Sequence, residues 1–152
     1  MIDVAAQRVI RCTPDELLSF VMDIRAYQRV DRKLARIYAV RRTDNTLLFK
    51  FRPRMAGLPL PPIWQRVELT PGVRIDIRNA SRLMQAVNPF HGSFVCERVE
   101  AGTLVTRRLS FDLPWPASRL LDRRLQRFLT DDIPRELEAA ATDLEPRSSL
   151  RG

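Results

Sequence analysis

The sequence predicts an α+β protein in which an antiparallel sheet wraps around one long helix at the C-terminal end. Three observations carry this prediction: a strong helix start follows the first strand, a long series of residues then alternates with period two, and an amphipathic helical pattern ends the chain. The 152 residues are 45% hydrophobic and 29% charged, which suits one globular domain with a sizeable core. We predict a single domain over residues 1–145 and a disordered tail over 146–152.

The first part of the chain is predicted to be a strand followed by two short helices. Residues 3–12 form the strand, and the segment Thr-Pro-Asp-Glu at 13–16 marks the first helix start. The threonine can cap the helix, the proline suits its first position, and the glutamate completes a capping box. Apolar residues at helical spacing extend this helix over 14–24, and a second short helix is predicted over 26–33.

Three hairpins are predicted in the middle of the chain, because alternating runs come in pairs around turn residues. They join 35–42 to 46–53, 63–70 to 73–79, and 92–99 to 103–112. The segment 53–62 contains four prolines and is predicted to be an exposed apolar loop, because proline is excluded from interior strands. The segment 80–91 fits either an irregular strand or a loop.

The final helix is predicted to start near 116–118 and to run to about residue 145. Its apolar side carries Leu121, Leu125, Phe128 and Leu129, followed by Leu137, Ala140, Ala141 and Leu144. Pro134 interrupts this pattern, because a proline inside a helix removes one backbone hydrogen bond and clashes with the preceding turn. We therefore expect the helix to kink or to divide between about 130 and 134.

Two segments resemble a known superfamily. The stretch Thr-Pro-Asp-Glu-Leu-Leu-Ser-Phe-Val-Met-Asp-Ile-Arg-Ala-Tyr at 13–27 and the turn Glu-Ala-Gly-Thr at 100–103 are similar to parts of START-like proteins. The resemblance spans residues 3–145 and points to the bacterial polyketide cyclase/dehydrase and lipid transport group. It departs from the family at 28–31, Gln-Arg-Val-Asp, where an aromatic residue and a proline often follow the tyrosine.

The resemblance implies a helix-grip fold, with seven antiparallel strands curved around the C-terminal helix and two short helices after the first strand. It also implies a hydrophobic cavity between sheet and helix, so residues 1–145 would form a START-like ligand-binding domain. The leading hypothesis is binding of a hydrophobic small molecule, lipid or polyketide-like, in that cavity. The alternatives are an aromatase/cyclase or dehydratase-type reaction without a metal, and a basic RNA- or ribosome-binding module.

Polar candidates for chemistry are few. Arg107 and Glu97 fall on the predicted apolar face of the last hairpin, where buried charges need partners. They either pair with each other or serve a ligand, with Arg107 anchoring a carboxylate or carbonyl and Glu97 moving a proton. A slipped register that places both in water is the alternative. His91, the single histidine, is interpreted as a turn residue, with proton donation as its other possible role.

Aromatic residues are candidates for contact with an apolar ligand, with an ordinary core role as the alternative. The candidates are Tyr38, Phe49, Phe51, Trp64 and, on the final helix, Phe128. No phosphate-binding glycine loop, nucleophile elbow or zinc-protease motif is present, and one histidine argues against a multi-histidine metal centre. We predict neither a cofactor nor a metal.

The net charge of +8 comes almost wholly from arginine. The dense group Arg119, Arg123, Arg124 and Arg127 is interpreted as a solvated helix face, with a nucleic-acid phosphate surface as the alternative. No apolar run approaches the roughly 20 residues of a membrane span. The N-terminal residues mix charges into apolar positions, and the two cysteines match no metal spacing. We predict a cytoplasmic protein without a transmembrane segment.

Overall fold

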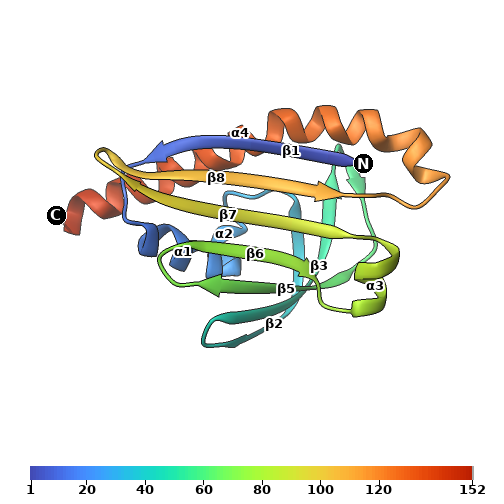
Figure 1. Ribbon diagram of the computed structural model, residues 1–152, viewed down its shortest axis with the longest axis horizontal. Coiled ribbons are helices and arrows are strands. Elements are labelled where there is room, and N and C mark those ends of the chain that lie inside the picture. The colour runs from blue at the N-terminus through green and yellow to red at the C-terminus, as the bar shows by residue number, and fades with distance from the viewer. Residues whose placement is uncertain (152) are drawn as a thin grey trace.

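The computed structural model describes the backbone of residues 1–151 and the side chains of residues 1–146. One curved sheet is covered on its inner face by α4, α1 and α2, with α4 running along β1 (Figure 1). The elements in chain order are β1 (Ile2–Ile10), α1 (Pro14–Met22), α2 (Ile24–Tyr27), β2 (Leu34–Thr43), β3 (Thr46–Met55), β4 (Leu58–Pro59), β5 (Ile63–Thr70), β6 (Arg74–Asn79), α3 (Arg82–Val87), β7 (Phe90–Val99), β8 (Gly102–Phe111) and α4 (Ala117–Arg151).

The sheet is antiparallel throughout. Within the described residues, seven strands follow the order β1-β8-β7-β6-β5-β3-β2, and the short β4 pairs with β3 outside this path. All three predicted hairpins are present, as β2–β3, β5–β6 and β7–β8. The N-terminal strand β1 pairs with the last strand β8, from Ile2 opposite Phe111 to Ile10 opposite Thr103. The predicted α+β helix-grip architecture is confirmed.

The predicted capping box starts α1. The Thr13 hydroxyl accepts the Glu16 N–H at 3.2 Å, and the Glu16 carboxylate accepts the Thr13 N–H at 3.3 Å. The helix ends at Met22, two residues earlier than predicted, because the Asp23 carboxylate caps the next helix by accepting the Ala26 N–H. Since α2 covers only Ile24–Tyr27, the helix predicted over 26–33 is wrong for residues 28–33, which form a loop.

Two apolar clusters share the inner face of the sheet. The larger one joins α1 and α2 to β3, β6 and β7, and it receives Leu137, Ala140, Ala141 and Leu144 from the C-terminal half of α4. The smaller one joins β1 and β8 to the N-terminal half of that helix through Leu125, Leu129 and Ile133. The long helix therefore packs on the sheet over most of its described length.

Three sequence expectations need correction. The final helix does not divide, because Pro134 lies at an exposed position of a continuous α4 and loses its hydrogen bond on the solvent side. The backbone stays helical past Pro146 to Arg151, in place of the disordered tail predicted over 146–152, and residue 152 lies outside the described residues. The proline-rich segment is not all loop, because β3 continues to Met55 and pairs there with β4.

The segment 80–91, for which the sequence left an irregular strand and a loop as alternatives, contains a helix. α3 covers Arg82–Val87, and the Ser81 hydroxyl caps it by accepting the Met84 N–H at 3.3 Å. No side chain of α3 is fully buried, and Leu83 and Val87 are largely exposed. This short helix therefore sits at the end of β6 as a surface element rather than as part of the core.

We predict that Leu129→Ala lowers the free energy of unfolding by about 2–5 kcal/mol, because Leu129 is fully buried between α4 and the sheet. Leu120→Ala is the matched control on the same helix: Leu120 is 76% exposed, so its loss should change stability by less than about 0.5 kcal/mol. Urea denaturation of both variants measures the difference. Equal losses would contradict the described packing of α4.

Candidate functional site

The inner face of the sheet and the helices around it enclose a cavity of about 420 Å³. This volume lies within the range of sites for small organic molecules. Most of the wall is apolar and includes Phe49, Phe51, Phe94, Leu109 and Phe111. Some lining residues are exposed or half-buried and therefore border the cavity: those of the proline-rich segment at 60–62, Met84 of α3, and Leu113 and Pro114 ahead of α4. The cavity therefore has a hydrophobic body beneath a border of connecting segments.

A buried charge cluster stands at the side of the cavity nearest α2. Its centre is Glu136 of α4, which accepts hydrogen bonds from the Tyr27 hydroxyl, from Lys33 Nζ at 2.8 Å and from Arg107 Nε at 3.1 Å. All four side chains are almost inaccessible to solvent. One carboxylate thus links α4 to α2, to the loop before β2 and to β8.

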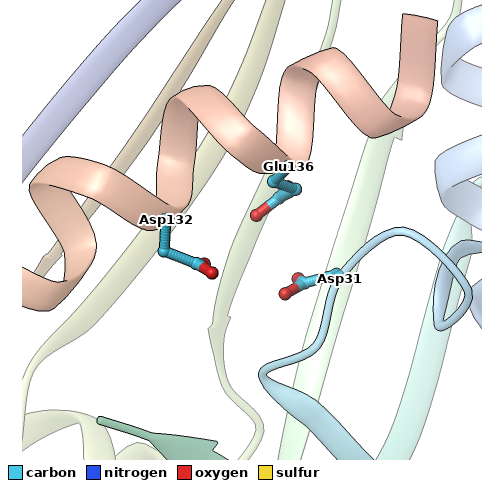
Figure 2. Close-up of side chains that lie close together, drawn as sticks. All are labelled: Asp31, Asp132 and Glu136. Atoms are coloured by element: carbon cyan, nitrogen blue, oxygen red, sulfur yellow. The ribbon is translucent and has the colours of Figure 1, made fainter. Parts of the chain in front are cut away.

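Lys33 has two further carboxylate partners. Its ammonium lies 2.9 Å from Asp31 and 2.5 Å from Asp132. Asp132 and Glu136 project from successive turns of α4 toward Asp31 on the loop between α2 and β2 (Figure 2). Oxygens of these three carboxylates lie within 4.8 Å of one another, a spacing suited to a cation, and Lys33 supplies a positive charge to all three.

The loop at 28–33 brings Asp31 and Lys33 into this position. The Asp31 carboxylate accepts the Lys33 N–H at 3.1 Å, a local turn that competes with continuation of the α2 helix. The Lys33 carbonyl then accepts the Arg54 N–H from β3 at 3.0 Å. Local side-chain bonding and attachment to the sheet therefore direct both charged residues inward.

The protonation of the cluster follows from burial and mutual charge. Burial would raise the pKa of Glu136, but the charges of Arg107 and Lys33 lower it to about 2. Burial and the Glu136 charge raise the pKa of Asp31, against the opposing effect of Lys33. The pKa of Lys33 lies above its usual value, because Asp31 and Glu136 outweigh its desolvation. Asp31 thus protonates more easily than an ordinary aspartate.

Arg107 is the cation of the cluster with donors left for other partners. Its bonds to Glu136 and to the Arg108 carbonyl use Nε and Nη1, and its guanidinium lies 4.3 Å from the ring centre of Phe94. A guanidinium has five N–H donors, so several are available at the cavity wall that Arg107 lines. Gly92 gives it room, because a Cβ there would lie 3.1 Å from Nη1.

The structure separates the three polar residues selected from the sequence. Arg107 lines the cavity, whereas Glu97 is exposed on the opposite face of the sheet. In the β7–β8 register Arg107 is opposite Phe94, and Glu97 is opposite Leu104, so the expected common inward face is wrong. His91 lies in strand β7, so its interpretation as a turn residue is wrong. It is partly exposed and contacts Asp76 through Nε2 at 2.9 Å, away from the cavity lining.

The predicted aromatic residues divide in the same way. Phe49 and Phe51 line the cavity. Tyr38 and Trp64 lie on the outer face of the sheet and are each 41% exposed, so they do not contribute to its wall. Phe128 packs against the smaller core cluster with the Arg32 guanidinium 4.9 Å above its ring, and it does not line the cavity either.

The arginine group of the final helix lies outside the cavity. Arg119, Arg123, Arg124 and Arg127 lie on α4 away from the cavity lining, and Arg124 donates to the Ala56 carbonyl at 2.8 Å. Three of them border a shallow surface depression with Leu120, Phe128 and Asp131. This placement agrees with a solvated helix face, and a nucleic-acid role for the group stays a prediction.

Curved sheet, gripping helix and enclosed cavity define a protein of the START-like helix-grip class. Residues 1–145 match the family described as polyketide cyclase/dehydrase and lipid transport, and the chain belongs to that family. Comparison with curated protein sequences gives no match. No helix among the described residues combines the length and apolarity that crossing a membrane requires.

Solved structures share the fold at low sequence identity. The protein TTHA0849 from Thermus thermophilus is 15% identical with a TM-score of 0.75, over 96% of this chain and 99% of that one. Zhui aromatase/cyclase from Streptomyces sp. R1128 is 12% identical with a TM-score of 0.73, over 95% and 94%. The di-domain aromatase/cyclase StfQ of the steffimycin biosynthetic pathway is 15% identical with a TM-score of 0.76, over 97% of this chain and 52% of that one. At these identities the likeness establishes the fold alone.

We predict that Glu136→Gln lowers the free energy of unfolding at neutral pH by about 3–5 kcal/mol, because buried Lys33 and Arg107 lose their shared carboxylate. Glu138→Gln, at an exposed position of the same helix, is the control and should change little. Urea denaturation of both variants at pH 7 measures the difference. Equal stability of the Glu136 variant and the wild type would contradict the central role of this carboxylate.

The same variant should alter the acid dependence of stability. The folded-state pKa of Glu136, about 2, lies below its ordinary value of 4.5. Its stabilisation is therefore present above pH 4.5 and is lost as the pH falls toward 2. Urea midpoints measured from pH 5 to pH 2 should fall less steeply in Glu136→Gln than in the wild type. Parallel curves would show that another group controls this acid transition.

Proposed function

We propose that the protein binds a hydrophobic small molecule, lipid or polyketide-like, in the cavity between sheet and α4, with an oxygen-bearing group of the ligand held by Arg107. The observation that carries the proposal is an apolar cavity of about 420 Å³ with one incompletely used guanidinium in its wall. Burial of the apolar part of a ligand supplies affinity, and the polar group fixes its orientation. Membership of the family supports this choice of ligand class.

Arg107 is a better anchor than Lys33, although both line the cavity. A lysine ammonium has three donors, and those of Lys33 face three carboxylates at 2.5–2.9 Å. A ligand oxygen would have to displace one of these partners. Arg107 needs no such exchange, because its forked guanidinium accommodates a carboxylate or carbonyl beside its existing bond to Glu136.

A second candidate function is catalysis of ring closure in the same cavity. The observation that favours it is the position of the Asp31 carboxyl group in the cavity wall. Its raised pKa and its place in the cavity wall suit a group that accepts and returns protons. In an aldol closure, Asp31 would take a proton from the carbon beside one carbonyl, and that carbon would bond to a second carbonyl. The new alkoxide would then receive the proton, with Arg107 stabilising its negative charge.

Substitution of Arg107 tests the binding proposal with dodecanoate as the probe. Arg107→Leu should weaken binding about 10- to 100-fold, because a hydrogen bond to a charged group is lost. Arg108→Leu is the neighbouring control, since Arg108 points outward and pairs with Asp3. Isothermal titration calorimetry measures both affinities.

Folding must be checked in the same experiment, because Arg107 also pairs with Glu136. Arg107→Lys keeps the positive charge and removes the fork, so it should remain folded and still bind the probe less tightly than the wild type. Dodecanoate binding that is unchanged in a folded Arg107→Leu or Arg107→Lys protein would end the anchor assignment. Circular dichroism reports on folding independently of the probe.

Substitution of Asp31 tests the catalytic candidate. Asp31→Asn keeps an oxygen that can accept the Lys33 N–H but removes the group that carries a proton. With the 1,5-diketone 2,6-heptanedione as probe, the wild type should accelerate closure to the cyclic hydroxyketone, which loses water to give the cyclic enone, and the rate in the variant should be at least about 100-fold lower. Enone absorbance measures the reaction. A wild-type rate equal to that of buffer would count against this candidate and leave the binding proposal intact.

A further inference from the structure

A second polar region lines the cavity, away from the charge cluster. It consists of the amide side chains Gln65, Asn79 and Asn88. Gln65 on β5 and Asn79 on β6 are directly opposite in the sheet, and both are more than nine-tenths buried. Asn88 follows α3 as its C-terminal cap residue. Three amides are unusual in a wall that is mostly apolar, so the hydrogen bonds of their oxygens need an explanation.

The amide of Asn79 is oriented by its neighbours. Its Nδ2 donates to the Asn88 backbone carbonyl at 2.8 Å, so the side-chain oxygen must point the other way. That oxygen, Oδ1, is buried and has no hydrogen-bond partner among the described residues. The Oδ1 atom of Asn88 is in the same situation. Buried acceptors without donors destabilise a fold, so two of them beside one cavity indicate that a donor comes from outside the chain.

The two polar regions are separated along the sheet. The Arg107 guanidinium lies beside Gly92, which pairs with Ile77 on β6. Asn79 follows Ile77 by two residues on the same face, which places it about 7 Å further along the strand. Ile77 and Phe90 line the cavity near this stretch. A molecule that reaches both regions must therefore have an apolar portion between its polar groups.

We propose that the cavity selects a ligand with two polar groups: an acidic or carbonyl group on Arg107, and a hydroxyl, phenol or N–H group that donates to the amide oxygens of Asn79 and Asn88. This inference rests on the binding function proposed above and narrows its ligand class. An unsubstituted fatty acid satisfies Arg107 but leaves the amide oxygens without a donor. A hydroxylated chain or ring system satisfies both, because the two buried amide atoms that lack a partner, Oδ1 of Asn79 and Oδ1 of Asn88, are acceptors.

The chemistry of the amides predicts a selective contribution. A site built around buried acceptors discriminates against analogues that lack the matching donor, because the acceptors then remain unpaired. The amide region should therefore affect the comparison between hydroxylated and plain ligands, whereas Arg107 should affect both alike. This difference separates the inference from the function on which it rests.

The experiment compares decanoate and dodecanoate with 10-hydroxydecanoate and 12-hydroxydodecanoate by isothermal titration calorimetry. In the wild type, at least one hydroxy acid should bind about 5- to 10-fold more tightly than the plain acid of equal length. Asn79→Leu should abolish this preference, so that the hydroxy acid and the plain acid of equal length bind this variant with affinities within about twofold of each other. Asn45→Leu, at an exposed turn between β2 and β3, is the matched control and should retain the preference.

Each outcome is decisive. The same preference in wild type and Asn79→Leu would show that the preference arises elsewhere, and no preference in the wild type would show that the amide oxygens do not bind the hydroxyl group; either result would overturn the inference. Binding of neither acid would overturn the proposed function itself. If Asn79→Leu does not fold, Asn88→Leu serves as the second variant, because the Asn88 contact with Asn79 is made by its backbone carbonyl.

Discussion

The carboxylate of Glu136 is the constraint on which the arrangement of the site depends. It is buried beneath α4 and receives donors from α2, from the loop before β2 and from β8. A buried charge is tolerated only when such partners are present, so the three contacts fix how α4 faces the sheet. The Glu136 carboxylate also binds the Lys33 ammonium and the Nε side of the Arg107 guanidinium. Donors of Arg107 that this contact does not use are therefore available at the cavity wall.

The empty volume of the cavity and the polar atoms in its wall do not stabilise the fold, but both suit the binding of a ligand. A well-packed interior has few voids larger than a water molecule, yet this one contains about 420 Å³ of space beside a partly used arginine. The charge cluster and the amide group place polar atoms at separate positions on an apolar wall. Family membership and fold agree with a small-molecule function, while binding, catalysis and ligand selection rest on the proposals made for Arg107, Asp31 and Asn79.

The sequence predicted the architecture well, because capping residues and alternating hairpins are local signals. It placed Arg107 inward, since Val105, Leu109 and Phe111 define the face of β8 without ambiguity. It failed for Glu97, because apolar residues occupy both faces of β7, and Val95 and Phe94 indicate opposite phases for that strand. The charge cluster depends on a loop that the sequence predicts as helix, although Asp132 and Glu136, one turn apart in the apolar stripe of α4, were a usable signal.

The absence of a side chain at Gly92 influences where the Arg107 guanidinium lies. Its missing side chain leaves the space that the Arg107 guanidinium fills, at a position where a methyl group would already be in tight contact with a terminal nitrogen. The direction of the cavity's cation is therefore set by an uncharged residue on a neighbouring strand. A larger residue at this place would force the same arginine to point elsewhere, so the position of the cavity's positive charge can change while every charged side chain is retained.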